Sequence, residues 1–189
     1  MHSLLPENPG LCLWLTGLSG AGKTTLCAAV EPRLIALGHR VRVLDGDDLR
    51  RTISRDLGFS KADRDENVSR LASLARDLVE QGFIVLVAAI SPYRCAREQA
   101  RAHIGNFLEV YVDAPLSLCI HRDPKHLYAR ALAGQLPNFT GLDDPYEAPI
   151  TPDVQCDTAH EDIEHCTARI LAAICTARSA VPAGAVTDS

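Results

Sequence analysis

The residues with the clearest chemical meaning form a glycine-rich loop near the start of the chain. Residues 17–24 fit G-x-x-x-x-G-K-[ST], a pattern that cradles the phosphates of a nucleoside triphosphate. Glycine permits the tight curl that points several backbone N–H groups at one polyanion, and the following helix adds its dipole. In this pattern Lys23 reaches the β- and γ-phosphates and the Thr24 hydroxyl binds Mg²⁺. The residues expected at the nucleotide are Gly17, Leu18, Ser19, Gly20, Ala21, Gly22, Lys23, Thr24 and Thr25.

A second motif, the acidic Asp45-Gly46-Asp47, follows about twenty residues after the loop. In isolation it indicates a tight turn in which Asp47 caps a helix. Downstream of a phosphate loop it favours catalysis, because phosphoryl transfer needs an aligned acceptor hydroxyl, a place for its proton and a held metal. We expect Asp47 to act on the acceptor hydroxyl and Asp45 to have a structural or Mg²⁺-binding role. The two motifs together predict phosphoryl transfer to a small molecule.

The elements around these motifs alternate between short apolar runs and amphipathic segments. This alternation predicts an α/β three-layer sandwich of the P-loop kinase type, with about five parallel strands and helices on both faces. Strands are expected at Leu11–Leu15, Val41–Leu44, Phe83–Ala88, Phe107–Val112 and Val154–Asp157. Helices are expected at Gly22–Leu37, Asp63–Gln81, Tyr93–His103, Pro115–Arg122, Pro124–Ala133 and Glu161–Arg178.

Ligands of open α/β sheets bind beyond the carboxyl ends of the strands. Three candidate segments, residues 17–24, 45–50 and 90–94, follow strand ends and should converge on one cleft. Residues 135–153 hold Gly, Pro and Asp without periodicity, which predicts a long loop that serves as a lid.

Composition restricts the remaining possibilities. The 189 residues predict one domain over residues 1–180 and a frayed tail at 181–189. A net charge of −5 gives no support for nucleic acid or a membrane surface as partner, and we expect neither. No secretory signal is visible, and the seven cysteines include no C-x-x-C, so we expect a reducing cytoplasm. Cys12, Cys27 and Cys119 are expected to be buried, and the segment with His160, His165 and Cys166 to be a solvated helix face.

Arginine and aromatic residues after the acidic motif suggest an anionic, base-bearing acceptor. The forks of Arg50 and Arg64 suit sulfate or phosphate oxygens, Asn67 follows on the same helix, and Phe59 can stack on a base. Surface arginines and a core phenylalanine are an equally good interpretation of this spacing alone.

Several separate motifs, in one order from about Trp14 to Thr158, resemble those of adenylyl-sulfate kinases (APS kinases). They are residues 44–50, 56–60, 63–67, 90–94, 112–115, 122–128, and 139–149 with its F-T-G and D-D-P-Y-E-A-P elements. The resemblance implies that ATP phosphorylates the ribose 3′-hydroxyl of adenosine 5′-phosphosulfate, giving ADP and 3′-phosphoadenosine 5′-phosphosulfate. We expect ATP and Mg²⁺ as cofactors, with Thr24 and Asp45 as the metal ligands. We also expect a homodimer and a functional link to ATP sulfurylase.

The resemblance also implies individual roles. Phe59 and Phe139 would sandwich the adenine of the acceptor, Arg122 would lie near the ATP base and Lys125 near the ATP phosphates. The acceptor would contact Asp45, Arg50, Phe59, Arg64, Asn67, Ile90, Ser91 and Phe139. The catalytic set would be Asp47, Lys23 and Ser91. Ser91 matches a serine described as a phosphoryl acceptor, but direct in-line transfer needs no covalent intermediate, and a hydrogen bond to the substrate is the other role considered.

Two positions depart from the family pattern. Asp48 replaces an asparagine, and His126 replaces a glycine. Asp48 would disfavour a dianionic acceptor if it pointed inward. Two rival functions are another small-molecule kinase on the same scaffold, and a nucleotide-dependent switch. The switch is disfavoured because the chain has no D-x-x-G or N-K-x-D element.

Overall fold

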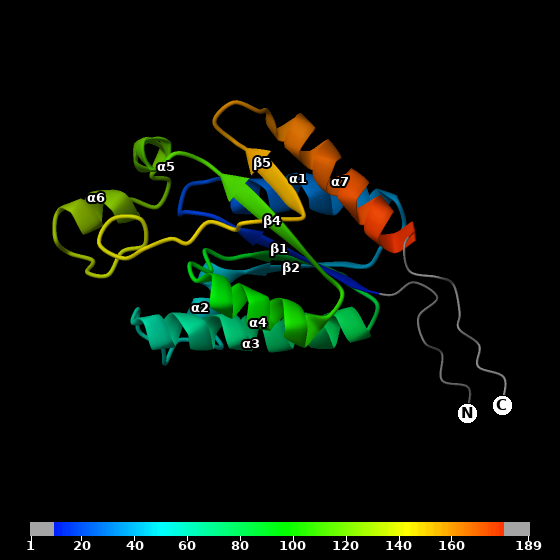
Figure 1. The fold of residues 1–189 in the computed structure, drawn as a ribbon, viewed down its shortest axis with the longest axis horizontal. Coiled ribbons are helices and arrows are strands. Elements are labelled where there is room, and N and C mark those ends of the chain that lie inside the picture. The colour runs from blue at the N-terminus through cyan, green and yellow to red at the C-terminus, as the bar shows by residue number, and fades with distance from the viewer. Residues whose placement is uncertain (1–9, 180–189) are drawn as a thin grey trace.

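The computed structural model describes residues 10–179, which form an α/β structure with a five-stranded sheet between two layers of helices (Figure 1). All strand pairs are parallel, and the strand order is β2-β3-β1-β4-β5. The strands are β1 (Leu11–Thr16), β2 (Val41–Asp45), β3 (Ile84–Ala88), β4 (Phe107–Asp113) and β5 (Val154–Asp157). The predicted fold class is confirmed, and every strand ends within one residue of its expected bounds. The expected tail, 181–189, lies outside the described residues.

The helices occupy three places relative to the sheet (Figure 1). Helices α1 (Lys23–Ala36) and α7 (Ile163–Ser179) pack together over one face, and α3 (Lys61–Glu80) and α4 (Arg94–Ile104) cover the other. The short helices α5 (Leu116–Arg122) and α6 (Leu127–Leu132) lie beyond the carboxyl ends of the strands. A further short helix, α2 (Gly46–Arg51), follows β2 directly.

Strand β1 is buried along its whole length and divides the core into two clusters. Leu11, Leu13 and Leu15 pack with the α1 and α7 side, while Cys12 and Trp14 pack with the α3 and α4 side. Successive side chains of a strand point to opposite faces of its sheet, and here helices cover both faces. The apolar run is therefore uninterrupted, and its carboxyl end is held rigidly where the phosphate loop begins.

Helix starts are where the sequence predictions fail, and side-chain caps accompany the failures. Helix α7 begins at Ile163 rather than Glu161, and the Asp162 carboxylate accepts the His165 backbone N–H at 2.8 Å. Helix α3 begins two residues before the expected Asp63, because Ser60 and Asp63 form a reciprocal capping box. Helix α2 was not predicted as an element, and Asp45 caps it rather than Asp47. Helix α6 begins at Leu127 instead of Pro124, since the Asp123 carboxylate accepts the backbone N–H groups of residues 127, 128 and 129.

The cysteine predictions are confirmed where they were specific. Cys12, Cys27 and Cys119 are buried, and all seven cysteines are free thiols. His160 and His165 are exposed as expected, but Cys166, expected on the same solvated face, is buried against the sheet. Within residues 10–179, no helix is both long and apolar enough to cross a membrane.

Candidate active site

The phosphate loop connects β1 to α1 through three glycines with positive φ. Gly17, Gly20 and Gly22 have φ of 153°, 75° and 110°, a region that disfavours other residues. At Gly17 a Cβ atom would lie 2.4 Å from the Val112 carbonyl oxygen, so the loop also needs glycine for space. Helix α1 has no acidic residue in its first turn and no side-chain cap at its N-cap, Gly22. Its first N–H groups are thus left to an anionic ligand.

Lys23 is folded across this loop. Its ammonium donates to the carbonyl oxygens of Gly17, at 2.9 Å, and Leu18, at 2.8 Å. Burial lowers the pKa of Lys23 to about 8, although nearby Asp47 acts in the opposite direction. A triphosphate bound in the loop would supply the negative charge that stabilises this desolvated ammonium in its protonated form.

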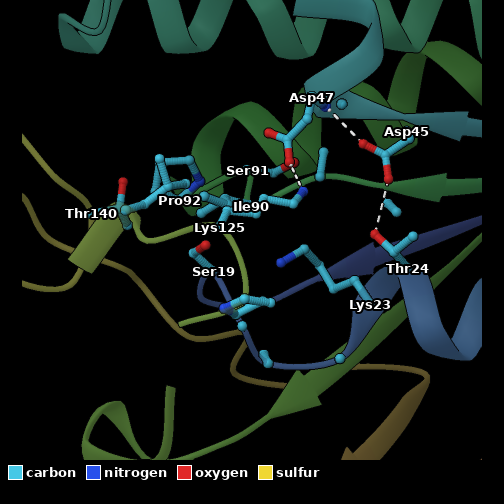
Figure 2. A pocket seen from close by; sticks show the side chains of 18 of the residues that line it. Ser19, Lys23, Thr24, Asp45, Asp47, Ile90, Ser91, Pro92, Lys125 and Thr140 are labelled. Carbon is cyan, nitrogen blue, oxygen red and sulfur yellow. Dashed lines mark hydrogen bonds and ion pairs between the residues drawn. The ribbon is translucent and has the colours of Figure 1, made fainter. Parts of the chain in front are cut away.

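The acidic motif lies opposite the loop, at the end of β2. Asp45 accepts a hydrogen bond from the Thr24 hydroxyl, at 2.9 Å, and caps α2 by accepting from the Asp47 backbone N–H, at 2.9 Å. The Asp47 carboxylate forms an ion pair with Lys125. Figure 2 shows Lys23 and Lys125 entering the same space from different sides, with Asp47 above them. Two cations and a carboxylate thus surround the place where a γ-phosphate would lie.

The Thr24–Asp45 pair fits a magnesium ion. Both side chains offer oxygen, and Mg²⁺ is usually held by one or two such protein ligands while it keeps several waters and binds substrate phosphates. In the described part of the chain, no group of three or more His, Cys, Asp or Glu side chains is placed to hold a metal. A metal carried in with the nucleotide suits this donor set better than a resident one.

A second group of side chains lies on the α3 side of the cleft. Phe59 is 55% exposed, and its ring lies 4.5 Å from the Arg50 guanidinium carbon. Arg64 is buried and donates to the Phe59 carbonyl oxygen, at 3.1 Å. Asn67 is also buried, and its Oδ1 has no hydrogen-bond partner among residues 10–179. An unpaired buried amide oxygen at a cleft wall is a group that a ligand can satisfy.

Ser91 has an unusual backbone and a hydroxyl that is already engaged. Its φ is 45°, in the left-handed region, and it is 3% exposed. The Ser91 hydroxyl accepts a hydrogen bond from the Trp14 indole N–H at 3.0 Å. Ile90 and Ser91 both line the cleft, as the resemblance implied, and their contact with a substrate stays a prediction.

The expected lid begins where α6 ends and contains Phe139. Asp143 orders it by accepting the backbone N–H groups of Asn138, at 2.7 Å, and Phe139, at 2.5 Å. Arg64 donates to the Asn138 carbonyl oxygen at 2.5 Å, which ties the lid to α3. Phe139 packs edge-on against Tyr128, with ring centroids 5.0 Å apart.

Thr158 and Tyr128 are site residues that the sequence analysis missed. The Arg122 guanidinium donates to the Thr158 hydroxyl, at 3.1 Å, and to its carbonyl oxygen, at 2.7 Å, while the Thr158 hydroxyl donates to the Ala21 carbonyl oxygen, at 2.8 Å. The Tyr128 hydroxyl donates to the Ser19 carbonyl oxygen at 3.1 Å. Thr158 directly follows β5, so the strand-end rule applied to the weakest strand would have found it.

The phosphate loop, the acidic motif, the Phe59 and Arg64 side, Phe139 and Thr158 line one cleft of about 1650 Å³, and Tyr128 supports the loop from outside it. Single-ligand pockets usually measure about 300–1,000 Å³, so the space suits two nucleotides. The predicted convergence of three strand-end segments is confirmed. Of the predicted site residues, all line the cleft except Gly17 and Leu18, which lie behind it as acceptors for Lys23.

The two departures from the family pattern leave this cleft intact. Asp48 is exposed, pairs with Arg51 at 3.5 Å and does not line the cleft. His126 has φ 53° and ψ 29°, a left-handed conformation that explains why glycine is favoured there.

The comparisons with known proteins agree with this geometry. The family model described as Adenylylsulphate kinase matches residues 9–157. The chain belongs to this family. The adenylyl-sulfate kinase of Synechococcus sp. (strain JA-3-3Ab) is 57% identical over 157 residues, which are 83% of this chain and 89% of that protein. The predicted family and the predicted enzyme class, a phosphotransferase, are therefore confirmed.

Solved structures give the same result. The Mycobacterium tuberculosis APS kinase in complex with AMPPNP and APS matches with a TM-score of 0.84 and 42% identity, over 88% of this chain and 98% of that one. A hexameric APS kinase from Thiobacillus denitrificans matches with a TM-score of 0.68 and 35% identity, over 90% of this chain and 29% of that one.

The depressed pKa of Lys23 predicts proton uptake when ATP binds. At about pH 8.5 roughly three-quarters of the free protein would carry neutral Lys23, given a pKa of about 8. The polyanion raises that pKa, so binding takes up a proton, and affinity falls as the pH rises above 8. Calorimetric titrations in two buffers of different ionisation enthalpy should give an uptake of roughly 0.7 proton at about pH 8.5, and almost none near pH 6.5.

Lys23→Arg is the control for this measurement, because guanidinium does not titrate in this range. It should abolish the uptake even where some affinity remains. Equal uptake in both proteins would show that another group takes up the proton.

Proposed function

We propose that this protein transfers the γ-phosphoryl group of ATP to the ribose 3′-hydroxyl of adenosine 5′-phosphosulfate. The products are ADP and 3′-phosphoadenosine 5′-phosphosulfate. The observation that carries the proposal is that one cleft holds two differently built halves. A phosphate loop forms one half, and an aromatic, arginine-lined wall with an unpaired Asn67 oxygen forms the other.

The donor half is built for a triphosphate. The loop N–H groups and Lys23 hold the β- and γ-phosphates, Lys125 approaches the γ-phosphate, and Arg122 lies on the side of the ATP base. Mg²⁺, held through Thr24 and Asp45, neutralises phosphate charge when it is bound. Positioning and charge neutralisation of this kind account for most of the catalysis in phosphoryl transfer.

The acceptor half presents the 3′-hydroxyl to that phosphate. Phe59 and Phe139 stack on the adenine, and Arg50, Arg64 and Asn67 hold the phosphosulfate and ribose. Asp47 accepts the hydroxyl proton as the new bond forms between the 3′-oxygen and γ-phosphorus and the bond to the β-phosphate bridging oxygen breaks. Lys125 must exchange its partner from Asp47 to phosphate for this to occur, which leaves the carboxylate free to act on the hydroxyl.

Ser91 acts in this scheme as part of the pocket wall. Its hydroxyl is buried and accepts from Trp14, which supports a positioning role over a covalent one. Direct in-line transfer between two bound nucleotides requires no phosphorylated serine.

The remaining expectations concern the protein's surroundings. Its acceptor is a sulfate already joined to an adenylate, so an enzyme that adenylylates sulfate must supply it. This is the expected link to ATP sulfurylase. A homodimer also stays a prediction, and light scattering on the 20.4 kDa chain tests it. A cytoplasmic location is expected as well.

The deciding experiment measures ADP release from Mg-ATP with adenosine 5′-phosphosulfate, with adenosine 5′-monophosphate, and without an acceptor. We expect stimulation by the phosphosulfate alone and a 3′-phosphorylated product. Nucleotide binding without stimulation would point instead to a kinase of another small-molecule hydroxyl.

Asp47→Asn should lower kcat by about 10²- to 10⁴-fold and leave the KM for ATP nearly unchanged, because it removes the proton acceptor but keeps the shape. Asp48→Asn is the matched control, since Asp48 is an adjacent, exposed carboxylate outside the cleft. It should keep full activity. Full activity in Asp47→Asn would disprove the role assigned to Asp47.

Lys23→Ala should reduce both ATP binding and turnover, because it removes the ammonium that contacts the β- and γ-phosphates.

Phe139→Ala should raise the KM for adenosine 5′-phosphosulfate roughly 5- to 150-fold, since base stacking contributes about 1–3 kcal/mol. The same change at Phe59 should act in the same direction. Steady-state kinetics with each nucleotide varied in turn measure the effect. An unchanged acceptor KM would exclude Phe139 from the pocket. The control is Ile53→Ala, which removes apolar surface at an exposed residue outside the cleft.

A further inference from the structure

Arg97 on α4 is a buried guanidinium that does not line the cleft. It is 2% exposed, yet each of its three nitrogens has a partner. Its Nε donates to the Glu109 carboxylate on β4 at 2.7 Å, its Nη1 to the Ser91 carbonyl oxygen at 2.6 Å, and its Nη2 to the Glu147 carbonyl oxygen at 2.7 Å. One rigid fork therefore joins a strand to two loops.

The first of these loops is the strained wall of the acceptor half. Ser91, at φ 45°, is a residue with a side chain in left-handed backbone, and such a conformation persists only where its surroundings impose it. Two contacts hold Ser91 here, from Trp14 to the hydroxyl and from Arg97 to the carbonyl oxygen. They act on opposite ends of the residue and fix its orientation.

The second loop returns from the lid. The Glu147 backbone N–H donates to the Pro92 carbonyl oxygen at 2.8 Å, so residues 91, 92 and 147 form one cross-linked unit around Arg97. Three residues before Glu147, Asp144 accepts a hydrogen bond from the Tyr93 hydroxyl at 2.9 Å and forms an ion pair with Arg64 at 3.5 Å. Arg97 thereby connects the base of the lid to the pocket wall.

We propose that Arg97 is a positioning residue for the acceptor nucleotide, which holds the Ser91 wall and the lid base in register from behind the cleft. This inference rests on the proposed function. The donor half is coupled to Arg97 only indirectly, because the phosphate loop is built on β1 and α1 and none of the hydrogen bonds of Arg97 reaches it. The nearest link is Tyr146, whose ring lies 5.8 Å from the Arg97 guanidinium carbon and whose hydroxyl lies 2.9 Å from the Thr16 hydroxyl. Loss of Arg97 should therefore weaken acceptor binding and leave ATP binding intact.

The ion pair with Glu109 anchors the fork but does not itself touch the cleft. Removing Arg97 alone would leave a buried carboxylate unpaired, which is costly for any fold. The informative comparison is therefore Glu109→Gln against Arg97→Met with Glu109→Gln. The double variant carries no buried charge at this place, whereas Glu109→Gln keeps the buried guanidinium without a carboxylate partner. The two proteins differ in that charge, in the bond to residue 109 and in the contacts to the carbonyl oxygens of Ser91 and Glu147, and of these only the carbonyl contacts reach the cleft wall and the lid base.

Steady-state kinetics of both proteins test the proposal. Glu109→Gln should keep both KM values within about twofold of the parent, whereas the double variant should raise the KM for adenosine 5′-phosphosulfate about tenfold or more and leave the KM for ATP within about twofold. Equal acceptor KM values in the two proteins would overturn the inference. So would a parallel rise in both KM values with a lower melting temperature, which is the mark of a purely structural role.

Trp14 supplies a readout that does not depend on activity. It is the chain's single tryptophan, is fully buried, and donates to Ser91. Arg97→Lys should change its emission, because one ammonium cannot reach all three acceptors and Ser91 moves, while Glu109→Gln should not. Unchanged emission in Arg97→Lys would overturn the inference. If the parent protein shows no stimulation by the phosphosulfate, the proposed function fails, and the emission result still tests the link from Arg97 to Ser91.

Discussion

The parallel register of β1 between β3 and β4 is the constraint on which the site depends. Leu15 pairs with Ala88 on one side and Val110 on the other, so three strands end at nearly one level. The phosphate loop, the Ile90–Pro92 wall and the segment after β4 then leave the sheet side by side. Because β1 is buried on both faces, the position at which the phosphate loop begins is fixed by the core. The cleft is a consequence of this shared edge and of the short helices placed beyond it.

Within the cleft, three cations of the donor half are already bonded to the protein. Lys23 donates to loop carbonyl oxygens, Lys125 pairs with Asp47, and Arg122 donates to Thr158. Such internal contacts hold long side chains in place at the cost of reduced affinity, since a ligand must replace each one. They also favour ligands that can replace all of them. A metal-bound triphosphate next to a second anionic nucleotide does so, whereas a lone phosphate leaves some of these groups with their internal partners.

The sequence predicts the parts of this protein that depend on local pattern. The five strands, the phosphate loop and the strand-end segments follow from apolar runs and from turn residues. Helix starts depend on side-chain caps, which is why Asp123 and the Ser60 capping box shifted two of them. Tyr128 and Arg97 act across long sequence separations on backbone carbonyl oxygens, and unlike Thr158 neither directly follows a strand. No sequence pattern marks a carbonyl oxygen as important, so the roles of these two residues are visible only in the folded structure.

The effect of a departure from the family pattern depends on where its side chain lies in the fold. Asp48 adds a negative charge next to the motif that meets an anionic acceptor, and on sequence alone this weakens the case for that acceptor. In the structure, capping by Asp45 starts α2 so that Asp47 enters the cleft and Asp48 faces outward to Arg51. A carboxylate 75% exposed and paired with an arginine is well screened from the cleft. The cap on α2 therefore directs Asp47 into the cleft and leaves Asp48 in solvent. The negative charge of Asp48 does not reach the arginine-lined acceptor wall.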